Sequence, residues 1–587
     1  MSKKNILRLG ILIMLFFILR IPAILFSFDN IYFDGDELSR GALAKEIMEK
    51  PMLPLFDYLD GDAGMYEGGR LLIAFITVPF FKILGDSYFS LKMVSIFLSV
   101  IMFILWYILS LKFFNHRVAL FWSLLFILSP PLYTQASLVT WGAHAEYYFF
   151  TALFLTFFHK IYFEHELSCV PIWVWATFGF FSGFGFWIIQ HNALVLAVCF
   201  IFFFLKDKKL FLKKYFWVYF FFLLIGYSPH IYQIFTRYWR HSAVYDSVLV
   251  HFPGEELRYM LPKLFSLIVK DFPHSLLFNH QIISYIYYFI FLFSFIYFIR
   301  LNKRNITHTI SKEFIFLAYF GAYLFVYTIG DFSVYEDNSV GGFLRYNYLT
   351  LVYPVMFLIV ACFLNRIWEL GKRVICVLLA SFFIVAGFWA NISLISFKNF
   401  GQPLREKGYS YFDLGDRLPL GLSKEGLQSL VGNLKWVNPK YGPEFLKGIS
   451  AGMAFNESVN QDIPGTLELF TKIPQEYQVS LYEGWGVGLN DIVLSNPAVG
   501  IEIVYQVDKL IADKYKKYFH YELGRGIITH AESINGLENL IIRMAGIISP
   551  PGRKYFYEGV IQGLSEVEDA GREGLILMFS SLNDRGI

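Results

Sequence analysis

Three carboxylates lie within four residues, directly after the first long apolar run of the sequence. They belong to Asp34, Asp36 and Glu37. Carboxylates grouped in this way can accept a proton from a hydroxyl, or hold a divalent cation through their oxygens. The alternative is a solvated acidic loop that caps the following helix, because negative charge is favourable at a helix N-terminus. The cluster alone leaves these interpretations open.

The first two of these acids also have the spacing of a metal-binding motif. Asp34 and Asp36 flank Gly35 in an Asp-x-Asp arrangement. Nucleotide-sugar enzymes present carboxylates to Mg²⁺ or Mn²⁺ in this form, and such cations prefer oxygen ligands. A divalent metal at Asp34 and Asp36 is therefore a candidate cofactor, and the sequence indicates no other.

A fourth carboxylate, Glu146, stands at the start of a later apolar run. An ionised side chain there is costly unless it has a partner or a water-filled cavity, so Glu146 is a candidate catalytic group. His144 lies two residues earlier and is placed to share its proton. The alternative is that Glu146 only complements the dipole at the start of its helix.

Two arginines have positions suited to a phosphate. Arg345 stands at the edge of a late apolar run, after a pair of glycines, and Arg70 ends the loop that contains the acids. A guanidinium fork matches phosphate oxygens, and glycines let a loop approach closely. The alternative for each arginine is a side chain that extends toward lipid headgroups.

Membrane-spanning helices must position these groups. Hydrophobic residues make up 56% of the 587 and charged residues only 17%, which excludes an ordinary soluble protein. The basic residues form small clumps between apolar runs, so no nucleic-acid partner is expected. The four cysteines have no metal-ligand spacing and imply no disulfide framework.

The apolar runs predict about eleven transmembrane helices, each of roughly 17–25 residues. We expect them near residues 6–28, 88–111, 118–136, 147–161, 171–189, 193–205, 216–234, 282–299, 314–330, 346–364 and 374–396. Between the first two, the loop 29–86 contains a helical pattern at 39–50 and an interfacial helix at 71–84.

The distribution of Lys and Arg predicts the orientation. These residues concentrate in alternate loops, which places the N-terminus in the cytoplasm. With an odd number of spans, the loop 29–86 and the C-terminal region then lie on the extracytoplasmic side. We expect an integral protein of a bacterial inner (plasma) membrane, in contact with its lipids.

Residues 397–587 have the mixed composition of a soluble domain, and they contain a repeat. An aromatic residue or leucine followed by a charged residue and a glycine recurs every 34 to 39 residues, at Phe412, Leu446, Tyr482, Tyr521 and Tyr557. Three copies continue as Gly-x-x-x-Gly, which places both glycines on one helix face. The period predicts a helix-turn-helix solenoid of tetratricopeptide-like size, with the glycines at a seam within each unit. The alternative is chance recurrence in a glycine-rich region.

Several of these stretches resemble one enzyme superfamily. The segment Phe33 to Glu37, the interfacial helix and the turn Trp141 to Glu146 resemble the GT-C membrane glycosyltransferases. The nearest branch is that of protein O-mannosyltransferases and lipid A aminoarabinose transferases, to which the glycine-rich run from Gly179 and the pair Arg345-Tyr346 are also similar. The resemblance covers residues 1–396.

The resemblance implies transfer of a sugar from a polyprenyl-phosphate donor to an acceptor on the outer face. It implies Asp36 and Glu37 as base, Glu146 as a further acid, and Arg345 with Tyr346 at the donor phosphate. The chain departs from the branch at Glu67-Gly68-Gly69, where a Lys-Pro or His-Pro is usual, and at Arg40, which is shifted by one position. These departures leave the donor contacts open.

The sequence thus predicts an all-α polytopic membrane enzyme of GT-C type at 1–396. A soluble α-helical repeat domain follows at 397–587 and would hold an acceptor or a partner protein. Two other functions are alternatives: a transporter or lipid flippase with proton-relaying acids, and a non-catalytic membrane anchor for the repeats. Acids clustered at one face, without paired halves in the sequence, favour the transferase over the transporter.

Overall fold

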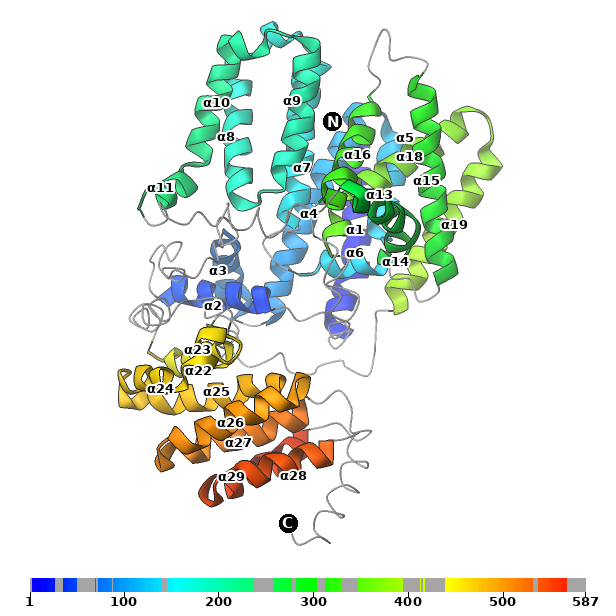
Figure 1. The fold of residues 1–587 in the computed structure, drawn as a ribbon. Helices are drawn as coiled ribbons and strands as arrows, with labels where there is room; N and C mark the ends of the chain where they lie inside the picture. The colour runs from blue at the N-terminus through cyan, green and yellow to red at the C-terminus, as the bar shows by residue number, and fades with distance from the viewer. Residues whose placement is uncertain are drawn as a thin grey trace. The chain divides into compact units, whose positions relative to one another are not determined.

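The computed structural model describes the chain at residues 3–26, 35–49, 69, 72–86, 88–139, 145–236, 257–276, 281–303, 312–329, 347–393, 412, 415–416, 439–530 and 537–566. Every regular element in these residues is a helix (Figure 1). Contacts divide the chain into two compact units. We call Met1–Glu37 with Glu67–Leu404 the membrane unit, and Leu38–Tyr66 with Arg405–Ile587 the C-terminal unit. The segment Leu38–Tyr66 of the first loop is thus grouped with the C-terminal unit, which the sequence did not predict.

The membrane unit contains the apolar helices. In chain order they are α1 (Lys3–Phe26), α3 (Leu72–Leu84), α4 (Tyr88–Phe113), α5 (His116–Ile127), α6 (Pro131–Ala136), α7 (Ala145–Tyr162), α8 (Ile172–Ile188), α9 (Asn192–Lys206), α10 (Lys214–Gly226), α11 (Ser228–Thr236), α13 (Leu257–Ser266), α14 (Phe272–Ser275), α15 (Gln281–Lys303), α16 (Phe314–Ile329), α18 (Tyr353–Glu369) and α19 (Arg373–Ser393). A 3₁₀ segment, Asn347–Val352, leads directly into α18.

Five helices among the described residues are long and apolar enough to cross a membrane. They cover Lys3–Ile24, Phe89–Phe113, Gln281–Leu301, Leu349–Glu369 and Arg373–Ile392. Six further helices, α3, α5, α8, α9, α10 and α16, are apolar but shorter. The prediction of an all-α polytopic membrane protein is confirmed. Each predicted run contains a helix, and the number of spans stays a prediction.

Two of the predicted spans are interrupted by proline. The run 118–136 is divided into α5 and α6, with Pro130 and Pro131 at the break. The run 216–234 is divided into α10 and α11 at Tyr227, two residues before Pro229. A proline has no backbone N–H and disfavours helical geometry in the residue before it, so it ends one helix and starts the next.

Two buried tryptophans tie four membrane helices together. Trp106 on α4 and Trp122 on α5 stack with their ring centroids 5.8 Å apart. The indole N–H of Trp122 donates to the carbonyl of Pro354 on α18 at 2.9 Å, and that of Trp106 donates to the carbonyl of Tyr148 on α7 at 3.0 Å. A buried indole needs such an acceptor, so these contacts set the relative heights of α4, α5, α7 and α18.

Glycines bring α8 and α10 into close contact. A Cβ atom at Gly179 or Gly183 of α8 would overlap a backbone carbonyl of α10, at Tyr219 and Leu223 respectively. A Cβ at Gly226 of α10 would in turn overlap the carbonyl of Phe180. Small residues four apart permit this approach between membrane helices, and α8 and α10 run beside one another in Figure 1.

The C-terminal unit consists of stacked helices. They are α22 (Gly442–Ala454), α23 (Glu457–Gln461), α24 (Ile463–Thr471), α25 (Gln475–Ser495), α26 (Pro497–Leu510), α27 (Asp513–Thr529), α28 (Leu537–Ile547) and α29 (Pro550–Glu566), yellow to red in Figure 1. The helices α22, α25, α27 and α29 contact one another in that order, and α24, α26 and α28 form a second row.

The repeated glycines lie between repeats and not within them. A Cβ at Gly484 of α25 would overlap the carbonyl of Lys447 on α22, and one at Gly559 of α29 would overlap that of Tyr521 on α27. Each repeat thus packs its glycine helix against the same helix of its neighbour. The predicted seam within each unit is wrong, because the period specifies which residues recur and not which copy they contact.

A buried polar cluster joins α26, α27 and the start of α29. His520 Nε2 lies 2.7 Å from Asp508 Oδ1, and the backbone N–H and hydroxyl of Ser549 each donate to Asp508 at 2.9 Å. Hydrogen bonds from His520 and Ser549 outweigh burial and lower the pKa of Asp508, while burial lowers the pKa of His520. The cluster therefore favours neutral His520 beside ionised Asp508.

Candidate active site

The first-loop acids fall at the beginning of α2, which runs from Gly35 to Glu49. The helix agrees with the predicted pattern at 39–50 and ends before Pro51, which cannot continue it. Asp36 and Glu37 occupy its first turn, where the helix dipole favours carboxylates. Asp34 and the side chain of Asp36 lie outside the described residues, so the metal site at these two acids stays a prediction.

Glu37 forms a buried ion pair with Lys92. The ammonium of Lys92, in the second turn of α4, donates to Glu37 Oε2 at 2.6 Å. The two side chains are 0% and 1% exposed, so the pair is shielded from water. Opposite charges compensate the cost of burying each other only when the geometry is this close. The contact fixes the first turn of α2 to α4.

Lys92 is not among the site residues predicted from the sequence, although its position inside an apolar run indicates a role. It is the single charged residue of the predicted span 88–111. An ionisable side chain inside an apolar run is expected to have a partner or a function. That partner is far away in the sequence, which is why the run itself does not identify it.

The start of α7, which carries Glu146, is held by two tyrosines. Glu146 is 6% exposed, in the first turn of the helix. The next residue, Tyr147, shares a hydrogen bond between its hydroxyl and that of Tyr319 on α16. Tyr148 donates from its hydroxyl to Thr350 Oγ1 at 2.8 Å. The backbone around Glu146 is therefore attached to α16 and to the segment Asn347–Val352.

This attachment bears on the predicted phosphate site. Thr350 lies five residues after Arg345, and its partner Tyr148 lies two residues after Glu146. The hydrogen bond thus joins the start of α7 to the segment Asn347–Val352. Arg345, Tyr346, Arg70 and His144 themselves lie outside the described residues, and their roles stay predictions.

Two further segments reach the same region. The ring of His191, in the turn before α9, stands edge-on to Tyr147 with centroids 6.5 Å apart. Gly69, the neighbour of Arg70, lies against the end of α8, where an added Cβ would be 2.5 Å from Ile188 Cα. The sequence singled out His191 only as a polar turn residue, and its contact with Tyr147 depends on the packing of α7 against α9.

The start of α2 and the start of α7 are attached to α4 at different levels. Lys92, which holds Glu37, and Trp106, which holds Tyr148, are almost four turns apart, roughly 20 Å of helix rise. The first turn of α2 is thus attached to α4 through Glu37, and the start of α7 through the carbonyl of Tyr148.

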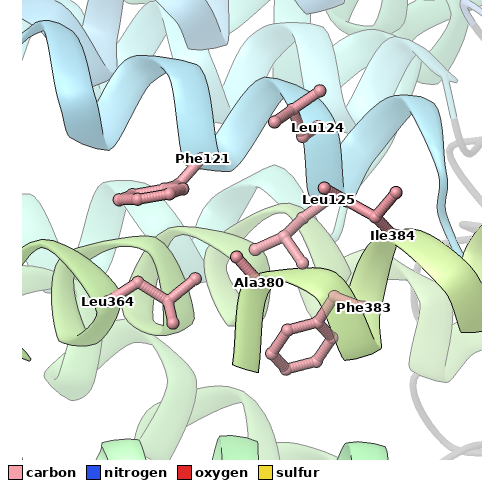
Figure 2. Close-up of a pocket in the computed structure, with 7 residues that line it drawn as sticks. All are labelled: Phe121, Leu124, Leu125, Leu364, Ala380, Phe383 and Ile384. Carbon is pink, nitrogen blue, oxygen red and sulfur yellow. The ribbon is translucent and has the colours of Figure 1, made fainter. Parts of the chain in front are cut away.

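No metal cluster is found within the described ranges. They contain no group of three or more His, Cys, Asp or Glu side chains placed to hold a metal ion. The pocket in Figure 2 lies between α5, α18 and α19, and apolar residues line it: Phe121, Leu124, Leu125, Leu364, Ala380, Phe383 and Ile384. It offers no group for catalysis.

Comparison with known proteins gives no family assignment. No family model and no curated protein matches the chain. Among solved structures, ArnT from Cupriavidus metallidurans bound to undecaprenyl phosphate has a TM-score of 0.42 at 10% identity, over 93% of this chain and 89% of that one. The oligosaccharyltransferase AglB from Archaeoglobus fulgidus, in complex with an inhibitory peptide and a dolichol-phosphate, has a TM-score of 0.39 at 13% identity. That match covers 74% of this chain and 60% of AglB.

An oligosaccharyltransferase of the same organism in the apo form has a TM-score of 0.39 at 12% identity, over 89% of this chain and 71% of that one. At these scores the likenesses assign neither site residues nor a substrate.

Proposed function

We propose that this chain is an integral-membrane glycosyltransferase that moves a sugar from a polyprenyl-phosphate donor to an acceptor on the extracytoplasmic face. The observation that carries the proposal is the buried ion pair between Glu37 and Lys92. It attaches the acid-bearing turn of α2 to a membrane helix. Burying two charges is expensive, and a reaction that needs a rigidly held carboxylate gives a reason to retain them.

The ion pair divides the roles of the two adjacent acids. One oxygen of Glu37 already accepts a hydrogen bond from Lys92 at 2.6 Å, so we assign Glu37 to holding the turn. Asp36, the residue before it, is then the general base. This assignment narrows the sequence-based expectation, in which either acid could take the proton.

In the proposed reaction the acceptor hydroxyl loses its proton to the carboxylate of Asp36. The oxygen attacks the anomeric carbon of the donor sugar in line with the phosphate. The new C–O bond forms as the bond to the phosphate oxygen breaks, and that oxygen keeps the electron pair. Polyprenyl phosphate leaves, the anomeric configuration is inverted, and Asp36 later releases its proton to water.

Charge develops on the leaving phosphate, and preorganised donors act most strongly there. We assign this role to Arg345, with Tyr346 and Arg70 as further contacts. We assign Glu146 and His144 to the same end of the site. The hydrogen bond from Tyr148, two residues after Glu146, to Thr350 supports this assignment. We propose that Glu146 orients this phosphate-binding group and that Asp36 acts on the acceptor.

Asp34 and Asp36 would also be the ligands of a divalent metal, if one takes part. A bound Mg²⁺ or Mn²⁺ would neutralise charge on the phosphate. The contacts of Arg345 are independent of this point, whereas a metal held by Asp36 would occupy the carboxylate that otherwise accepts the proton.

The test is sugar transfer by the purified full chain in proteoliposomes. Undecaprenyl phosphate carrying glucose, mannose or aminoarabinose serves as donor, and release of undecaprenyl phosphate is measured. We expect Asp36→Asn to slow release by about 10²–10⁴-fold, the usual contribution of a general base. The matched control is Asp207→Asn in the exposed turn between α9 and α10, which should keep full activity. Unchanged release by Asp36→Asn would contradict the proposed base.

A further inference from the structure

A buried arginine on α1 lies outside the acids described above. Arg20 is 0% exposed, near the end of α1 that leads into the first loop. Among the described residues no carboxylate pairs with it. Its donors reach neutral oxygens instead: Nη1 donates to Asn391 Oδ1 at 2.6 Å, Nη2 to Ser129 Oγ at 2.9 Å, and Nε to Ser137 Oγ at 3.3 Å.

These oxygens come from the ends of three other helices. Ser129 follows the last turn of α5, Ser137 is the C-cap of α6, and Asn391 is in the last turn of α19. Nη2 also lies 3.5 Å from the carbonyl of Phe126 in the last turn of α5. A helix C-terminus carries partial negative charge, so converging helix ends offset the charge of the guanidinium without a carboxylate.

The acceptors are bonded to one another as well as to Arg20. The hydroxyls of Ser129 and Thr134 lie 2.9 Å apart, and the Thr134 hydroxyl donates to Asn391 Oδ1 at 3.3 Å. Ser137 donates to the carbonyl of Thr134 at 2.7 Å. Together these groups bridge the break at Pro130 and Pro131, where backbone groups lack helical partners.

The helices that meet at Arg20 lead to the candidate active site. Beyond its last turn α1 continues into the first loop with Asp34 and Asp36. Beyond α6 the chain continues to His144 and Glu146. A guanidinium with a rigid, planar set of donors can hold several helix ends at fixed spacing, whereas a lysine with one small ammonium cannot.

We propose that Arg20 is a positioning residue that sets where the chain leaves the ends of α1 and α6, and thereby the placement of the reacting groups. The inference rests on the proposed function for its effect on catalysis. Its effect on the helix ends is independent of that function, and the two effects are measured separately.

The experiment compares Arg20→Gln and Arg20→Lys with wild type in the full chain, in detergent and in proteoliposomes. Amide hydrogen exchange should rise in Arg20→Gln at residues 128–139 and 387–393, while the amides of α8 keep their protection. With undecaprenyl-phosphate sugar as donor, kcat should fall about a hundredfold, as for a small misplacement of reacting groups, with donor KM changed much less. Arg20→Lys should be intermediate.

Arg117→Gln is the matched control, because Arg117 contacts the ring of Trp368 at the far end of α5. It should change neither readout. Ser137→Ala removes one acceptor and should give a smaller rise in exchange in the same segments, which keeps the test decisive if Arg20→Gln does not fold.

Unchanged exchange in both segments, or a uniform rise through the membrane unit, would overturn the positioning role. If Asp36→Asn keeps full transfer, the proposed function fails, and the exchange result still decides the role of Arg20.

Discussion

Lys92 on α4 donates a hydrogen bond to Glu37 on α2 across 2.6 Å, and both side chains are almost completely buried. This contact has two structural consequences. It places the acid-bearing turn of α2 at a fixed point of a membrane helix, and it leaves Asp36 as the neighbouring carboxylate for chemistry.

Lys92→Met should destabilise the folded protein by about 3–5 kcal/mol, because Glu37 would remain buried without its counter-charge. The double variant Lys92→Met with Glu37→Met should recover most of that loss, since it removes both charges together. Thermal unfolding in detergent measures the stability of the single and the double variant. A double variant as unstable as the single one would show that the pair is not coupled as the structure has it.

Glu146→Gln should leave the protein folded and reduce transfer. The substitution keeps the shape of the side chain and removes its charge. We expect a loss of about a hundredfold, as for a small misplacement of reacting groups, because Glu146 is proposed to orient the phosphate-binding group. Full activity would identify it as an acid that serves the start of α7 only. Release of undecaprenyl phosphate is the measurement, with detergent thermal unfolding as the check on folding.

Gly484→Leu should destabilise the C-terminal unit by about 1–3 kcal/mol or more, as overpacking does. The reason is the overlap of any Cβ at this position with the carbonyl of Lys447. Gly546→Ala is the control, because nothing lies within 4 Å of a Cβ there and alanine favours a helix by about 0.5–1 kcal/mol. Pulse proteolysis of the full chain in urea compares the stabilities of the two variants. Equal stability of both variants would argue against the seam.

The C-terminal unit should lose stability in acid. The folded-state pKa of His520 lies below 6.5 and that of Asp508 below 3.8, so the unfolded chain binds more protons at acidic pH. The stabilisation is complete above about pH 6.5 and declines as the pH falls toward and through the lowered pKa of each group. His520→Gln should flatten the upper part of this dependence, measured as the urea midpoint between pH 8 and pH 5. An unchanged slope would exclude His520 as its cause.

The orientation can be tested directly. Reporter fusions after Lys214 and after Lys398 should report cytoplasmic and extracytoplasmic positions, because Lys and Arg concentrate in the loops assigned to the cytoplasm. A cytoplasmic signal after Lys398 would change the number of spans and move the repeats to the other side of the membrane.

Much of the fold was predictable because it is encoded locally. Apolar runs of spanning length and a repeat in the C-terminal region are properties of neighbouring residues, and they identified the all-α membrane class. Pro51 and the helical spacing before it placed α2 to within a few residues. The glycine face of α8 has the same origin, since Gly179 and Gly183 share one face of a helix by spacing alone, whereas its partner α10 does not follow from spacing.

Only the tertiary structure decided the partners of these residues. Glu37 and Lys92 are 55 positions apart in the chain, and Tyr148 and Thr350 are 202 apart. The repeat period did not determine that Gly484 would contact the preceding copy at Lys447, nor did the apolar run of α1 predict four acceptors around Arg20. Hydrophobic pattern and helix geometry act over a few turns, whereas the partner of a buried charge depends on which helices pack together. The sequence therefore identified the all-α membrane class and the candidate acids. The packing of the helices decided which of these acids have buried partners, and which residues those partners are.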